Sequence, residues 1–154
     1  MTTTIATAKT SSTTQTAAGS TGTKSLADRA RPAVLAVFRA VVSFLFLCHG
    51  VMGFGLLGGI DNAGGAFPFG QWPGYWASLI EVVGAGLVFA GLFTRVSAIV
   101  LSGVMAYAYF TVHAPQGLFP VHNMGEPAAL YAWIFLAIAV VGPGAASLDQ
   151  LRRR

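Results

Sequence analysis

The chain has 154 residues, of which 55% are hydrophobic and only 9% charged, and its formal net charge is +4. Soluble domains carry about 25% charged residues, so these few charges cannot coat a water-facing surface. The composition predicts an integral membrane protein with one small all-α domain, and the modest charge does not indicate nucleic-acid binding. The single Cys48 excludes an internal disulfide and a Cys-x-x-Cys pair.

The first 31 residues differ from the rest of the chain in composition. They begin with a stretch rich in Thr, Ser, Ala and Gly that has no apolar periodicity. Such a composition buries too little apolar surface to fold, so we predict a disordered cytoplasmic tail over residues 1–31. No apolar core follows the start, so the stretch does not resemble a signal peptide.

A membrane domain is predicted over residues 32–147, followed by a basic cytoplasmic C-terminus at 148–154. Its apolar segments each approach the ~20 residues that cross a bilayer as a helix. Backbone in lipid must satisfy its own hydrogen bonds, which favours helices. We therefore predict a four-helix bundle with transmembrane helices at about 33–57, 74–93, 96–113 and 127–143.

The positive charges predict the orientation of these helices. Lysines and arginines occur before the first segment, between the second and third, and after the fourth. The positive-inside rule then places both termini in the cytoplasm. Arg95 belongs to this topological set. Arg39 lies inside the first segment, where we expect its long side chain to snorkel to the interface, with a buried pairing as the alternative.

Several polar side chains are predicted to converge at one depth. At about 1.5 Å per residue, His49, Glu81 and His113 all fall in the outer third of a ~30 Å hydrocarbon core. Asn123 and Glu126 lie in or beside the outer loop that precedes the fourth segment. A charged group in hydrocarbon costs about 2.5–3.5 kcal/mol on insertion scales. Glu81 should therefore be buried among partners or line a wet cavity.

Glu81 and His49 are the candidate groups for proton exchange in this predicted site. His113, Tyr109, Asn123 and Glu126 are candidate quinone-binding residues, and Tyr109 lies one helical turn from His113. The competing interpretation is a neutral Glu81 that hydrogen-bonds to a histidine and only fixes the packing. Glu126 can alternatively stabilise the start of the fourth helix.

These residues also carry a family resemblance. The stretches "RAVVSFLFLCHG", "SLIEVVGAGLVFAGLFTRVSAIVL", "HNMGEPAALYAW" and "GPGAASLD" resemble the DoxX family over about residues 35–150. Relatives often carry a Lys shortly after His-Gly, whereas Gly53 and Phe54 follow "HGVM" here. A function that depends on that Lys is therefore in doubt for this chain.

The resemblance implies a multi-pass four-helix protein of the bacterial plasma membrane that is linked to redox chemistry. One relative is a small subunit of a thiosulfate:quinone oxidoreductase, and another joins a membrane complex with a superoxide dismutase and a sulfurtransferase. Arg39, His49, Glu81, Arg95, Asn123 and Glu126 stand at family positions.

Four functions are compatible with these patterns. The first is a redox subunit that binds a quinone, without an intrinsic cofactor, and receives electrons from another protein. The second is a non-catalytic scaffold that anchors soluble redox enzymes or other membrane subunits, alone or as a homo-oligomer. A small transporter built around Glu81 is the third. The fourth is a haem or metal protein that uses His49 and His113, with His122 and Glu126 as further ligands.

Overall fold

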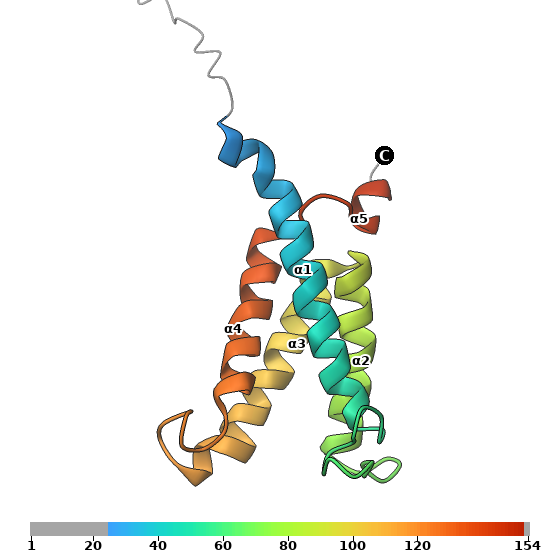
Figure 1. The fold of residues 1–154 in the computed structure, drawn as a ribbon, viewed down its shortest axis with the longest axis vertical. Helices are drawn as coiled ribbons and strands as arrows, with labels where there is room; N and C mark the ends of the chain where they lie inside the picture. The colour runs from blue at the N-terminus through green and yellow to red at the C-terminus, as the bar shows by residue number, and fades with distance from the viewer. Residues whose placement is uncertain (1–24, 153–154) are drawn as a thin grey trace, which may run out of the picture.

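The structure is a computed structural model that describes residues 25–152 (Figure 1). The described part is helical and contains no β-strand, only two isolated bridges in the loop after the first helix. A π-helical turn and a 3₁₀ turn continue the third helix without a break. The elements are α1 Leu26–Met52, α2 Gly74–Ala90, α3 Thr94–Ala108, η1 Tyr109–His113, η2 Ala114–Gln116, α4 Glu126–Val141 and the short α5 Leu148–Leu151.

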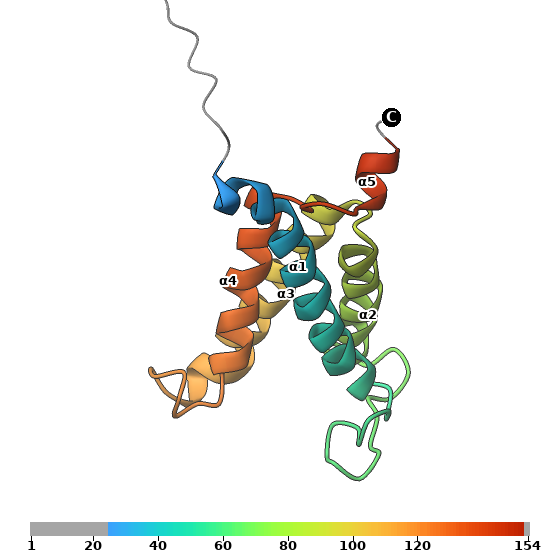
Figure 2. The ribbon, with the colours of Figure 1, turned by 45° about the horizontal axis from the view of Figure 1, so that its top comes forward.

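The four long helices pack in sequence order, α1 on α2, α2 on α3 and α3 on α4. Phe46 of α1 also reaches α4, where its ring lies 4.8 Å from the rings of both Tyr131 and Phe135. This contact brings the first and last long helices together around a shared core. The start of α1 and the end of α4 lie at one end of the molecule, and the two long loops lie at the other (Figures 1 and 2).

The outer surface of the helices is apolar. Val37, Phe44, Val83, Val96 and Val140 are each more than half exposed. Such a surface is stable in lipid and would be unstable in water. The stretches Leu26–Met52 and Thr94–Gln116 are long and apolar enough to cross a membrane, while α2 and α4 are shorter apolar helices.

Helix α1 begins at Leu26, inside the stretch 1–31 for which a disordered tail is predicted. Ser25 and Asp28 form a capping box there, in which the Ser25 side chain accepts from the Asp28 backbone and the Asp28 side chain accepts from the Ser25 backbone. This pairing satisfies backbone donors that a helix start otherwise leaves open. The predicted disorder of residues 1–24 lies outside the described residues.

The first helix also ends earlier than predicted, at Met52 instead of residue 57. A glycine-rich loop follows, and Gly55 adopts a φ of +83° that favours glycine over other residues. The other predicted ranges agree with α2, α3 with η1, and α4 to within a few residues at each end. Hydrophobic periodicity therefore located the helices, while local capping and turn residues set their ends.

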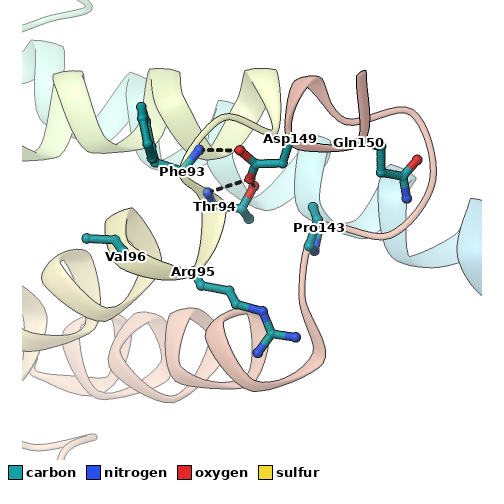
Figure 3. A pocket seen from close by; sticks show the side chains of 7 residues that line it. All are labelled: Phe93, Thr94, Arg95, Val96, Pro143, Asp149 and Gln150. Carbon is teal, nitrogen blue, oxygen red and sulfur yellow. Dashed lines mark hydrogen bonds between the residues drawn. The ribbon is translucent and has the colours of Figure 1, made fainter. Parts of the chain in front are cut away.

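The C-terminal segment is docked onto the helices, which the prediction of a basic C-terminus did not anticipate. The Asp149 carboxylate accepts from the backbone N–H groups of Phe93 and Thr94 at 2.9 and 3.0 Å, and from the Thr94 hydroxyl (Figure 3). It thereby caps the N-terminus of α3 from a distant part of the chain. The Asp149 backbone also donates to Gly91.

Arg39 does not snorkel, contrary to our expectation, and is only 3% exposed. Its guanidinium donates to the carbonyls of Val88 and Phe89 at the end of α2, and to Ala146 in the C-terminal segment. Helix ends carry unpaired carbonyls with partial negative charge, so a buried cation is stabilised there. The alternative expectation of a buried pairing holds, with backbone carbonyls as the partners.

Arg95 performs a similar role at the end of α4, where it donates to the Ala139 carbonyl at 3.1 Å. It lies in the first turn of α3 and is exposed. Arg39 and Arg95 thus each bind carbonyls at the C-terminal end of a neighbouring helix.

Candidate functional site

The helices α1 and α2 approach closely where the predicted site lies. A Cβ atom placed on Gly50 would lie 3.0 Å from the Glu81 Cβ, and one on Gly53 would clash with the Ser78 side chain. Only glycine allows this approach of the two backbones, as small residues commonly do at helix interfaces in membranes. The Gly50 and Gly53 face of α1 therefore fixes the position of Ser78 and Glu81 on α2.

A cavity of about 530 Å³ opens beside this contact, at the end of the molecule opposite the described termini. It brings together three of the predicted site residues, His49 of α1, Glu81 of α2 and His113 of η1. Most of the other side chains around it are apolar or aromatic. They are Met52, Ile60, Phe67, Trp72, Pro73, Ala77, Val104, Met105, Tyr107, Ala108 and Val112, with Gly53, Gln71, Gly74, Ser78 and Thr111 between them.

Glu81 is the buried ionisable group of this cavity and is 5% exposed. Within residues 25–152, no side chain or backbone group forms a hydrogen bond with its carboxylate. A buried carboxyl group without a protein partner is costly in an apolar setting. The packing interpretation, in which a histidine hydrogen-bonds to Glu81, is therefore not what the geometry shows.

His49 lies on the wall of the cavity formed by α1. Its ring stacks on Phe46 at a centroid distance of 5.8 Å and an interplanar angle of 23°. Phe46 is fully buried between α1 and α4. The core of the protein thus orients the imidazole, and the ring still borders the cavity.

His113 enters the cavity from a π-helical turn at the end of α3. Its Nδ1 lies 3.0 Å from the Asn123 carbonyl oxygen. A π-helical turn holds more residues than an α-helical turn, so it rotates the following side chains relative to the α3 faces. This rotation and the bond to Asn123 set the direction of the His113 ring.

Tyr109, Asn123 and Glu126 do not line the cavity, contrary to the predicted grouping. Tyr109 lines a separate hollow between α3 and α4. Asn123 is buried, and its side chain donates to Gly117 and accepts from Gly125 within the loop. Glu126 is an exposed residue in the first turn of α4.

Sequence reasoning missed several cavity residues. Trp72 and Tyr107 contact each other with ring centroids 6.4 Å apart, and Gln71 and Thr111 add polar groups. Trp72 belongs to an aromatic-rich loop, and this composition could have indicated that the loop contributes to the site. Tyr107 in α3 and Thr111 in η1 carried no such signal, because their direction depends on how these helices pack against α2.

A loop between α1 and α2 covers the cavity, and Asp61 holds that loop together. Its carboxylate accepts from the backbone N–H groups of Gly65 and Ala63, both at 2.8 Å. These bonds lower the pKa of Asp61 because they stabilise its charged form. Ile60 and Phe67, on either side of this turn, both line the cavity.

The ionisable groups around the cavity are few. Its lining contains Glu81 and two histidines but no Lys or Arg. The arginines of the described chain that make hydrogen bonds, Arg39 and Arg95, bind carbonyls at the opposite ends of α2 and α4. The cavity therefore suits a neutral ligand with hydrogen-bonding groups better than an anion.

The chain is similar to one protein family and to a protein of known sequence. An uncharacterized protein of Haemophilus influenzae is 43% identical over 126 residues, which cover 80% of this chain and 93% of that protein. No solved structure matches the chain. The sequence profile of the DoxX family matches residues 34–114, which include every helix that contributes to the cavity. The chain is therefore a membrane protein that belongs to the DoxX family.

Proposed function

We propose that the protein is a membrane subunit of a redox system and binds a quinone in the cavity around Glu81. The observation that carries this proposal is the convergence of one carboxyl and two imidazole groups in a mostly apolar cavity of about 530 Å³. Ligand sites commonly have this size and this balance of apolar walls and few polar groups.

In the proposed topology all four long helices cross the bacterial plasma membrane and both termini lie in the cytoplasm. Arg29, Arg31, Arg95 and Arg152 all belong to the helix ends on the side of the described termini. The positive-inside rule supports the cytoplasm on that side. The helices α2 and α4 would span about 25 Å each at 1.5 Å per residue, close to the ~30 Å core.

The cavity residues have the chemistry that a quinone needs. Its flat ring can pack against aromatic side chains such as Phe67 and Tyr107. One of its carbonyl oxygens can accept a hydrogen bond from His49. The Nδ1–H of His113 donates to the Asn123 carbonyl, so His113 can donate to the other quinone oxygen from Nε2 only as an imidazolium. Reduction adds two electrons and two protons to the ring system, one proton at each carbonyl oxygen. Glu81 and the imidazoles are groups that exchange protons with such oxygens.

The electrons in this proposal come from a reduced partner protein, either a soluble enzyme or another membrane subunit. One observation favours contact with a soluble partner at the proposed cytoplasmic end. A hollow of about 430 Å³ lies there between the start of α3 and the docked C-terminal segment, lined by Arg95, Pro143 and Gln150 among others (Figure 3). Phe93 also lines this hollow; its side chain is 51% exposed, and the Arg152 guanidinium lies over its ring.

The second candidate function, a non-catalytic scaffold, rests on this same hollow. In that case the docked C-terminal segment binds soluble redox enzymes, and the Glu81 cavity holds no quinone. The two candidates differ in what the purified protein retains.

The test is a solvent extraction of quinone from protein purified in mild detergent, for the wild type, Glu81→Gln and Glu126→Gln. Glu126 is a matched control because it is a carboxyl group at the same end of the molecule but outside the cavity. We expect stoichiometric quinone in the wild type and Glu126→Gln, and a loss in Glu81→Gln. Folded wild-type protein that neither retains nor rebinds quinone would support the scaffold instead.

A further inference from the structure

One apolar hollow adjoins the cavity on the outward face of α2 and α3, and a second hollow adjoins the first. The first, of about 300 Å³, shares Trp72, Pro73, Ala77, Val104 and Tyr107 with the cavity. The second, also about 300 Å³, shares Ile80 and Val100 with the first. We call the two together the α2–α3 groove. Its remaining lining residues are Trp76, Leu79, Val83, Gly84, Leu87, Val96, Ser97 and Gly103.

The groove follows the helices away from the polar cavity. It extends along α2 from Ala77 to Leu87, about 15 Å at 1.5 Å per residue. Ile80, Val83 and Val100 in its walls are 39%, 54% and 45% exposed. In a membrane protein such a surface faces hydrocarbon, so the groove suits a flexible apolar chain that lies parallel to the helices.

On the basis of the proposed function, we infer that the ligand of the cavity is a quinone with a prenyl tail, and that the tail lies in the α2–α3 groove. Because the hollows continue from the cavity, together they form one site with a polar end at Glu81 and an apolar extension along α2 and α3. An uncharged head fits this cavity, because its lining has a carboxyl group and two histidines but no Lys or Arg to hold a phosphate. This charge pattern distinguishes a prenyl quinone from a phospholipid.

Two glycines provide a matched test of the groove. A Cβ atom on Gly103 of α3 or on Gly86 of α2 would meet no atom within 4 Å, and both residues are exposed. Gly103 lines the groove, whereas Gly86 lines neither the groove nor the cavity. Leucine at either position also suits a helix better than glycine does. A difference between the two variants would therefore come from the groove.

The experiment measures binding of two quinones with the same ring, one without a tail and one with several prenyl units, to detergent-purified protein. The proteins are the wild type, Gly103→Leu, Gly103→Ala and Gly86→Leu. Each quinone partitions into micelles to the same extent in all four samples. The ratio of the dissociation constants of two proteins therefore reports the contribution of the groove. Thermal unfolding of each variant confirms that it is folded.

We expect Gly103→Leu to weaken binding of the prenyl quinone by about tenfold, the effect of losing roughly 50 Å² of apolar burial. Gly103→Ala should have a smaller effect, and Gly86→Leu should match the wild type. The tailless quinone should bind all four proteins alike. If the prenyl quinone binds Gly103→Leu and the wild type equally well, the tail does not lie in the α2–α3 groove. That result would not contradict binding of the quinone ring in the cavity. No binding of either quinone to the wild type would overturn the proposed function itself.

Discussion

Arg39 and Glu81 are both buried charged residues in the α1–α2 pair, but the fold treats them differently. Arg39, near the end that carries the described termini, donates to three backbone carbonyls. Glu81, near the opposite end, has no hydrogen bond from residues 25–152 and lines a cavity. At one end of the molecule, the buried Arg39 side chain joins α2 to the C-terminal segment. At the other end, the Glu81 carboxyl group faces a cavity.

The difference separates an end that polar contacts hold together from an end that contains a cavity. Around Arg39, the end of α2, the start of α3 and the C-terminal segment are connected by polar contacts of Arg39 and Asp149. Around Glu81, the close contact with α1 depends on glycines, which supply no hydrogen-bonding side chain. Substitutions at the two ends should therefore affect different properties.

The largest expected effect is on the stability of an Arg39→Met variant. It removes the donors to Val88, Phe89 and Ala146 and leaves those buried carbonyls without this partner. We expect a loss of about 3–5 kcal/mol in the free energy of unfolding. The measurement is unfolding in detergent followed by circular dichroism. A loss below about 1 kcal/mol would show that the guanidinium bonds add little net stability.

The next effect concerns the close approach of α1 and α2. In Gly53→Ala the new methyl group clashes with Ser78, so the two helices must separate. We expect a loss of about 1–3 kcal/mol in the free energy of unfolding, the usual cost of overpacking. Adding Ser78→Gly should recover part of this loss, whereas Gly103→Ala alone should cost no stability, because its Cβ meets no neighbour and alanine favours a helix over glycine. Failure of the double variant to recover any stability would contradict the contact.

A smaller stability effect is expected from Glu81→Gln, in contrast to Arg39→Met. The carboxylate has no hydrogen bond from the described chain to lose, and glutamine removes a buried charge. We expect the free energy of unfolding to change by less than about 1 kcal/mol or to rise. A loss comparable to that of Arg39→Met would mean that Glu81 is a structural residue and would remove the contrast between the two ends.

The smallest effect is the pH dependence of the loop that covers the cavity. The N–H groups of Gly65 and Ala63 lower the pKa of Asp61 in the folded state. Its contribution is therefore complete above the pKa of the unfolded chain and is lost as pH falls through the lowered pKa. Amide hydrogen exchange at Gly65 and Ala63 should accelerate in acid relative to a distant loop. Asp61→Asn should remove this dependence; an unchanged acid profile would contradict the assignment.

The sequence predicted much of the fold and part of the site. Apolar segments identified the four long helices, and a common depth grouped His49, Glu81 and His113, which do share one cavity. The start of α1 could also have been predicted, since Ser25 and Asp28 have the spacing of a capping box. The Thr- and Ser-rich composition of the preceding residues led instead to a prediction of disorder there. Tyr109 was assigned to the site by its spacing from His113, but it lines a separate hollow between α3 and α4, which spacing along one helix could not show.

By itself, the sequence determined the membrane character and the level at which polar side chains lie, because both follow from composition and from a constant rise per residue. The tertiary structure alone decided which polar groups are paired. Whether Arg39 snorkels or binds carbonyls depends on where α2 ends and where the C-terminal segment returns. Whether Glu81 has a partner depends on the rotation of α1 and α3 around it, which packing sets.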